Sequence, residues 1–150
     1  MNTIMKEIIL TERELTSEEF QRMKRGFDEH AIEQGVKVQK ADRFTFVSER
    51  EGKFIGTASG LAYKNGDEYS GWFYLTDLFL EKEYRRQGLG AQLLSRMEAK
   101  LKEHHIQNIW TWTAGYEAPG FYKRQGYHVF AEMEDWYSDG NSRVGLRKKL

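Results

Sequence analysis

The chain has 150 residues, with 23 Lys plus Arg balanced by 23 Asp plus Glu, and it has no cysteine. A chain of this length can bury roughly 70% of its unfolded surface in one core, so we expect a single domain over residues 1–150. The lack of cysteine excludes disulfides, thiolate metal sites and a cysteine nucleophile, and it is compatible with a cytoplasmic location, which we expect. Zero net charge disfavours nucleic acid and anionic membranes as partners, and no segment is long and apolar enough to span a bilayer.

The first part of the chain predicts a short strand over residues 6–10, followed by a helix. Thr16 and Glu19 have the spacing of a capping box, in which each residue bonds the backbone of the other. Apolar residues then recur at helical spacing, and Gly26 either lies within one helix or divides it into two shorter ones. The two positions of a hydrophobic staple are also occupied, by Leu15 and Phe20.

From residue 43 onward the pattern predicts alternating strands and short helices. The apolar run at residues 72–80 is nearly continuous, as is typical of a strand covered on both faces. The element order predicts one α/β (α+β) domain whose central sheet is mixed, mostly antiparallel and flanked by helices. Predicted strands cover residues 43–49, 54–63, 72–80, 107–113, 128–133 and 143–149, and predicted helices begin near residues 89 and 119.

A strand, a glycine loop and an amphipathic helix follow one another between residues 75 and 101. A helix that begins at Gly88 and Gly90 leaves its first backbone N–H groups unpaired, and its dipole favours an anion there. Arg85 and Arg86 add donors suited to phosphate oxygens. The loop lacks the third glycine of a dinucleotide fold and the Gly-Lys-Ser/Thr of a P-loop. The remaining alternative is that the glycines only turn the chain.

Two motifs carry a resemblance to a known family. The loop matches Arg/Gln-x-x-Gly-x-Gly/Ala through Arg85, Gly88 and Gly90, and a second segment, Phe121-Tyr122-Lys123-Arg124-Gln125-Gly126-Tyr127, matches a short helix that ends in Phe/Leu-Tyr-x-x-x-Gly-Phe/Tyr. Together they resemble the GNAT superfamily of acyl-CoA-dependent N-acetyltransferases. The element order fits this resemblance from about residue 6 to residue 150.

The resemblance implies that acetyl-CoA is the donor, with its pyrophosphate on the loop and its pantetheine arm along the preceding strand. It also implies that Tyr122 protonates or hydrogen-bonds the departing thiolate, against the alternative of a core ring with a hydroxyl tip. Asp77 is the candidate base, with an equal alternative as a carboxylate that orders its strand. The residues implied in donor binding are Leu78, Phe79, Leu80, Arg85, Arg86, Gln87, Gly88, Leu89, Gly90, Ala91 and Tyr122.

Other polar residues are weaker candidates. Glu117 could serve as a base or as a helix-dipole partner, and His104-His105 is better explained by a helix C-terminus than by a site. No metal-ligand spacing occurs, so no metal is expected. Candidate acceptor residues, each also explicable as ordinary surface, are Asp28, Glu29, Glu33, Asp67, Glu68, Tyr69 and Trp72.

The resemblance therefore predicts an N-acetyltransferase that moves an acetyl group from acetyl-CoA to a primary amine by direct attack in a ternary complex. The acceptor is expected to be a small-molecule or peptide amine. The alternative is a non-catalytic acyl-CoA sensor that retains the loop and acts through a partner. A homodimer is an open option, with Trp136-Tyr137 as one candidate contact.

Overall fold

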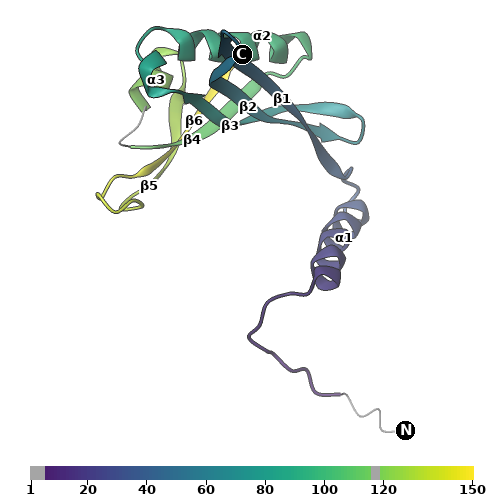
Figure 1. The fold of residues 1–150 in the computed structure, drawn as a ribbon. Helices are drawn as coiled ribbons and strands as arrows, with labels where there is room; N and C mark the ends of the chain where they lie inside the picture. The colour runs from purple at the N-terminus through teal and green to yellow at the C-terminus, as the bar shows by residue number, and fades with distance from the viewer. Residues whose placement is uncertain (1–5, 116–118) are drawn as a thin grey trace. The chain divides into compact units, whose positions relative to one another are not determined.

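The computed structural model describes residues 6–115 and 119–150, and the chain divides into two compact units, one ending at Val38 and one spanning Gln39–Leu150. The expectation that residues 1–150 form a single domain stays a prediction. The elements, shown in Figure 1, are α1 (Ser17–Glu33) in the first unit and, in the second, β1 (Gln39–Arg50), β2 (Lys53–Asn65), β3 (Glu68–Leu80), a 3₁₀ turn η1 (Lys82–Tyr84), α2 (Leu89–Glu103), β4 (Asn108–Ala114), α3 (Pro119–Arg124), β5 (His128–Met133) and β6 (Arg143–Lys149).

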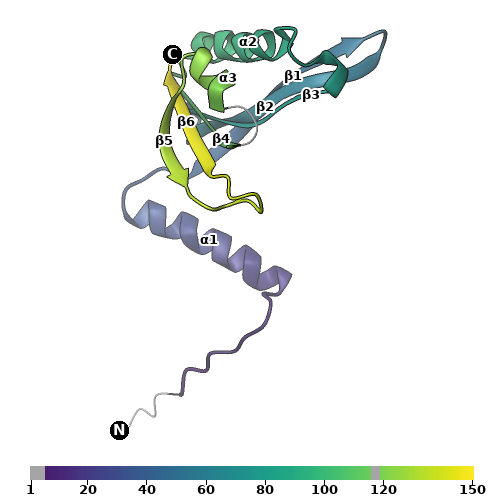
Figure 2. The same cartoon turned by 90° about the vertical axis from the view of Figure 1, so that its left-hand side faces the viewer.

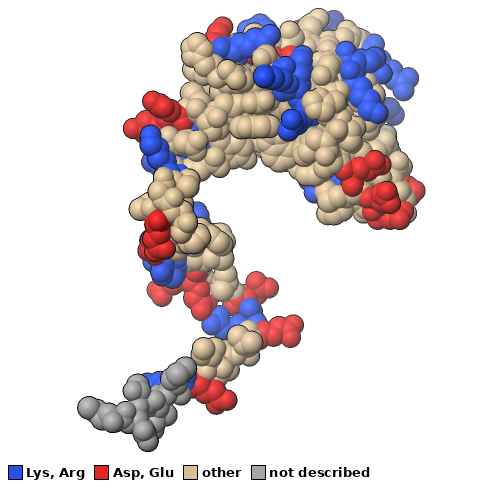
Figure 3. Space-filling view, turned by 180° about the vertical axis from the view of Figure 1, so that it is seen from behind, with Lys and Arg blue, Asp and Glu red and all other residues tan. Residues whose placement is uncertain are grey.

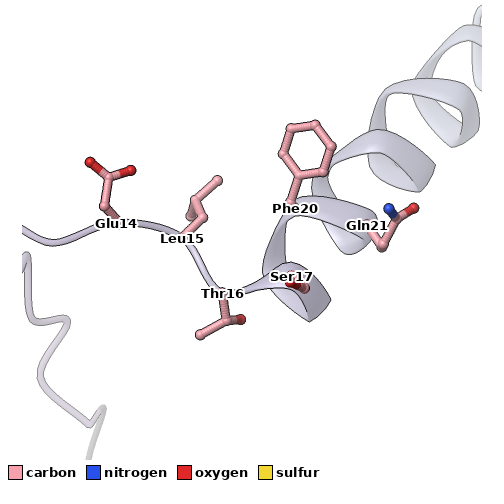
Figure 4. Close-up of a pocket in the computed structure, with 6 residues that line it drawn as sticks. All are labelled: Glu14, Leu15, Thr16, Ser17, Phe20 and Gln21. Atoms are coloured by element: carbon pink, nitrogen blue, oxygen red, sulfur yellow. The ribbon is translucent and has the colours of Figure 1, made fainter.

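Helix α1 begins with the predicted capping box. The backbone N–H of Glu19 donates to Thr16 Oγ1 (3.1 Å), and the backbone N–H of Thr16 donates to Glu19 Oε1 (2.8 Å). Arg13 adds a two-point ion pair to the same carboxylate (2.8 and 2.9 Å). The hydrogen bonds from Arg13 and from the Thr16 backbone lower the pKa of Glu19 to about 2. Figure 4 shows Leu15 and Phe20 pointing to the same side of the chain, as a hydrophobic staple requires.

One expectation for the first unit is wrong, and the structure decides between the two alternatives for Gly26. Residues 6–10 form no strand, and the side chains of Ile8, Ile9 and Leu10 are 84%, 78% and 95% exposed. A strand needs a partner for its backbone groups, and the described residues of this unit contain no other strand. Gly26 does not divide α1, because a single glycine costs a helix only about 1 kcal/mol. The ion pair between Arg22 and Glu29 (3.1 Å) also spans that glycine.

The second unit is built on a six-stranded sheet with the strand order β1-β2-β3-β4-β6-β5. Every neighbouring pair is antiparallel except β3 and β4, which are parallel. The turns of the two N-terminal hairpins contain Gly52 (φ 75°) and Gly66 (φ 66°), both in the left-handed region that favours glycine. The predicted mixed, mostly antiparallel α+β sheet is thus confirmed.

Helices α2 and α3 lie on the same face of this sheet, as Figures 1 and 2 both show. Helix α2 contributes Leu93, Leu94, Met97 and Leu101 to the core, and α3 contributes Tyr122. Their partners in the sheet are mainly Phe44, Ala58, Ala62, Phe73, Leu75, Ile109, Val144 and Leu146. We call this side of the sheet the helix face and the opposite side the second face.

Within the second unit, β3 is covered on the helix face only, so the expectation that it is covered on both faces is wrong. Phe73 and Leu75 are buried on the helix face, whereas Trp72 and Phe79 are 37% and 42% exposed. Except for Phe79, the residues that alternate with the buried ones are amphipathic or polar, so most of them tolerate contact with water. A continuous apolar run therefore did not imply burial on both sides.

Candidate active site

The loop before α2 ends in an uncapped helix N-terminus. Gly88 occupies the N-cap position with φ 81°, and no side chain in the described residues caps it. The first helical hydrogen bond runs from Gln92 N–H to Gly88 O (3.1 Å). The N–H groups of Leu89, Gly90 and Ala91 precede that bond and have no acceptor within the helix. Together with the helix dipole, these donors suit an anion.

The arginines of the loop have different surroundings. Arg85 Nε donates to the backbone carbonyl of Leu80 (3.1 Å), so this side chain ties the loop to the end of β3. Arg86 has φ 62°, an uncommon and strained value for a residue with a side chain. Gln87 Nε2 donates to the carbonyl of Glu83 (3.0 Å) and closes the loop on itself. The loop is thus held in one shape by its own side chains.

Strands β3 and β4 separate before β3 ends. They pair at Trp72–Asn108, Phe73–Ile109 and Tyr74–Trp110, and the described residues show no further pairing between them. Beyond that point β3 continues to Leu80 paired with β2 alone, while β4 continues to Ala114 paired with β6. Residues 78–80 of β3 therefore have one unpaired backbone edge, which a further extended chain could join.

The loop, the end of β3 and α3 meet on the helix face. A Cβ added to Gly90 would lie 3.6 Å from both Leu80 and Phe121, so the backbone at Gly90 closely approaches both side chains. Next to Phe121, the Tyr122 ring is 6% exposed, and its centroid lies 5.5 Å from that of Tyr127. The predicted donor-binding segments are thus brought together, and Tyr122 lies in the adjoining core.

Asp77 lies on the second face because β3 has a bulge. Ser59 pairs with Asp77 and Gly60 pairs with Leu75, so Thr76 is the extra residue between them. The bulge brings the side chains of Thr76 and Asp77 together, with Thr76 Oγ1 2.7 Å from Asp77 Oδ2. The two candidate catalytic residues, Asp77 and Tyr122, therefore lie on opposite faces, on either side of the gap between β3 and β4.

Two groups of side chains near these positions were missed from the sequence. On the second face, Arg43 Nη1 donates to Ser59 Oγ (2.9 Å) and to Thr76 Oγ1 (3.0 Å). The alternation of Arg43 and Thr45 with the apolar residues of β1 was the available signal for a polar face there.

In the core beside Tyr122, the Tyr127 hydroxyl donates to Glu98 Oε2 (2.7 Å), and Lys148 Nζ donates to Glu98 Oε1 (2.8 Å). Burial and the Glu98 carboxylate raise the pKa of Tyr127 above its ordinary value. No pattern in the sequence linked these residues, which come from α2, the segment after α3, and β6. The group ties α2 to the C-terminal strand.

The second face also carries an aromatic cluster. The rings of Tyr74 and Trp110 have centroids 4.1 Å apart, and those of Trp112 and Phe130 are 5.8 Å apart. A Cβ on Gly145 would come within 2.9 Å of both Trp112 and Phe130, so only glycine lets these rings cross the backbone of β6.

Several weaker candidates are engaged elsewhere. Glu29 and Glu33 contact Arg22 (3.1 Å) and His30 (3.8 Å) along α1. His104 packs between Phe44 and Tyr69, with ring centroids 5.3 and 5.4 Å away, as expected for a helix C-terminus rather than a site.

Tyr69 donates its hydroxyl to Asp42 (2.8 Å), and this bond lowers the pKa of Asp42. Glu117 lies outside the described residues.

Charge is distributed unevenly over the second unit. In Figure 3, Lys and Arg side chains predominate toward the top of the view, the level at which α2 lies in Figure 1, with a few Asp and Glu among them, and further Asp and Glu lie lower. Within residues 6–115 and 119–150, no group of three or more His, Cys, Asp or Glu is arranged to hold a metal ion. None of the helices in that part of the chain combines the length and apolarity needed to cross a membrane.

The separation of β3 and β4 beside the uncapped N-terminus of α2 is an arrangement suited to an extended ligand that carries phosphate groups. The chain matches the family model described as "Acetyltransferase (GNAT) domain" over residues 11–150. It therefore belongs to the GNAT acetyltransferase family, as the two motifs predicted.

Individual relatives agree with this assignment. Blasticidin-S acetyltransferase of Streptomyces morookaense is 34% identical over 82 residues, which cover 53% of this chain and 58% of that protein. An acetyltransferase from Bacillus cereus ATCC 14579 has 26% identity and a TM-score of 0.78, over 94% of this chain and 98% of its own. An aminoglycoside 6'-N-acetyltransferase complexed with coenzyme A has 15% identity and a TM-score of 0.59, over 71% of this chain and 72% of its own. At that identity, the last comparison supports the fold alone.

Proposed function

We propose that this chain transfers an acetyl group from acetyl-CoA to a primary amine, by direct attack within a ternary complex. The observation that carries the proposal is the gap between β3 and β4 directly beside the uncapped N-terminus of α2. It offers an unpaired strand edge and an anion site in one continuous arrangement. Membership of the GNAT acetyltransferase family supports an acetyl donor.

The described residues fit such a donor. The backbone N–H groups from Arg86 to Ala91 would bind the pyrophosphate, and the free guanidinium nitrogens of Arg85 and Arg86 would add charge-assisted hydrogen bonds. The free edge of Leu78, Phe79 and Leu80 would pair with the amide groups of the pantetheine arm. Acetyl-CoA supplies the thioester, and an N–H of this edge would stabilise the negative charge that develops on its oxygen.

Because Asp77 and Tyr122 lie on opposite faces of the sheet, each would carry out a different proton transfer. An amine near pH 7 is mostly ammonium, and Asp77 would accept its proton directly or through water. The nitrogen would then bond to the acyl carbon, the carbon–sulfur bond would break, and the sulfur would leave with a proton from Tyr122. The second proton lost by the nitrogen would return to Tyr122. The products are an amide and a free thiol, with one proton released to solvent for each ammonium consumed.

The test is thiol release that depends on both acetyl-CoA and an amine, measured across a broad amine panel with the product identified by mass. Tyr122→Phe should lower kcat by about a hundredfold or more, with little effect on CoA binding. Tyr63→Phe, on β2 and outside the loop and the gap, is the matched control. Equal turnover in Tyr122→Phe would remove that hydroxyl from the mechanism.

The burial of Tyr122 favours a second candidate, a non-catalytic acyl-CoA sensor, because a ring in the core can serve packing alone. A sensor would be stabilised by acetyl-CoA, by about 2.7 kcal/mol at a hundred times Kd. It would release no thiol with any amine of the panel. Stabilisation by acetyl-CoA without thiol release would therefore favour the sensor over the enzyme as the function of this chain.

A further inference from the structure

On the second face, Arg43 reaches from β1 across β2 to β3. Its Nη1 atom lies 2.9 Å from Ser59 Oγ and 3.0 Å from Thr76 Oγ1. Ser59 is itself held by Thr45, whose hydroxyl oxygen lies 2.8 Å away. The guanidinium is thus positioned by neutral hydroxyls, which hold its geometry without forming an ion pair.

A hydroxyl also separates this cation from the carboxylate of Asp77. Thr76 Oγ1 contacts both Arg43 Nη1 (3.0 Å) and Asp77 Oδ2 (2.7 Å), so the two charges lie within about 6 Å of each other. Among the described residues they form no direct ion pair, unlike Arg13 and Glu19, which bind at two points. The Nε–H and the Nη2 group of Arg43 have no partner in that part of the chain, and both side chains are exposed.

We propose that Arg43 and Asp77 select an acceptor that is an amino carboxylate, meaning an amine with a carboxylate a few bonds from its nitrogen. This inference rests on the proposed function. The ammonium would bind Asp77, at the position where the proposed proton transfer occurs, and the carboxylate would bind the free N–H groups of Arg43. A polyamine would bring a second positive charge toward Arg43, and a peptide N-terminus would present a neutral carbonyl to it.

The first experiment compares matched amines with acetyl-CoA and the wild-type chain. Phenylalanine, phenylalaninamide and phenethylamine differ only at the carboxylate, and γ-aminobutyrate tests a longer separation of the charges. Free amino carboxylates should have kcat/KM values about tenfold or more above their amides and decarboxylated forms. Equal use of all three forms would overturn this inference and leave the proposed function intact. Failure of every amine, polyamines and peptides included, would overturn the proposed function itself.

The second experiment tests the role of Arg43. Arg43→Met should raise KM for the amino carboxylate about tenfold or more and leave KM for acetyl-CoA and for the amide unchanged. Arg43→Lys keeps the positive charge and should retain part of the preference for free carboxylates over amides. It also provides the test if Arg43→Met does not fold. Arg50→Met, at the last residue of β1, is the control and should keep the wild-type preference. An unchanged preference for the free carboxylate in both Arg43 variants would overturn the assignment.

Discussion

Helices α1 and α2 start in opposite ways. Helix α1 begins at Thr16 with a complete capping box, has Glu18 and Glu19 in its first turn, and has no buried residue. Helix α2 begins at Gly88 without a side-chain cap or an acidic residue in its first turn, and it buries Leu93, Leu94, Met97 and Leu101.

The difference shows how a helix can leave its N-terminal donors free. Helix α1 uses its own side chains to satisfy those donors, and its first-turn carboxylates already complement the dipole. Helix α2 is stabilised by its apolar contacts with the sheet, because most helical stability in proteins comes from packing. Its first N–H groups can therefore remain available to a ligand.

The largest expected effect is the loss of core packing under α2. Leu101→Ala removes a fully buried side chain and should lower the free energy of unfolding by about 2–5 kcal/mol. Urea unfolding followed by tryptophan fluorescence measures this cleanly, because all four tryptophans lie in the second unit. Lys102→Ala, exposed on the same helix, should change the free energy by less than about 0.5 kcal/mol. Equal effects of the two variants would contradict the assignment of α2 to the core.

A smaller effect is expected at the start of α2. Gly88→Ala should cost about 1–2 kcal/mol, because φ 81° is unfavourable for a residue with a Cβ even though the space beside it is open. Gly90→Ala is the matched control, since its Cβ would meet Leu80 and Phe121 at ordinary contact distance and alanine favours the helix. The same urea experiment compares them. A Gly88→Ala variant as stable as Gly90→Ala would show that the left-handed N-cap is not required.

The smallest effect concerns acid and α1. The pKa of Glu19 is lowered from 4.5 to about 2, so its contribution is fully present above pH 4.5 and is lost as the pH falls through about 2. The Glu19 carboxyl resonance, followed by NMR, should therefore titrate near pH 2, and α1 should lose helicity over that window. Arg13→Ala removes the largest cause and should move the titration toward 4.5, and Thr16→Ala, which keeps the backbone N–H of residue 16, should move it less. A wild-type Glu19 that titrates near 4.5 would show that the capping box does not persist in solution.

Most elements were predictable from local sequence patterns. These patterns indicate the backbone conformation of a segment and which of its faces is buried. The helices expected near residues 89 and 119 and the strand at residues 128–133 all appear as expected. The loop at Arg85–Gly90 also leads into a helix as predicted. The strand expected at residues 6–10 failed because a pattern of apolar residues cannot supply the partner that a strand needs.

The site was only partly predictable. The loop and Tyr122 are candidates that came from motifs, whose residues are close together in the chain. Arg43 was missed because its partners, Ser59 and Thr76, are 16 and 33 residues away, and only the sheet register brings them together. The position of Asp77 beside Thr76 depends on a bulge, which alternation along β3 does not reveal.

The sequence by itself determined the family, the order of the elements from α1 onward and a helix N-terminus entered through glycine, because all of these depend on short stretches of chain. The tertiary structure decided where β3 and β4 separate, which face carries Asp77, and how Arg43 reaches it. Those features depend on strand register and on packing between distant segments, and a one-residue shift in register would place the same side chains on the other face.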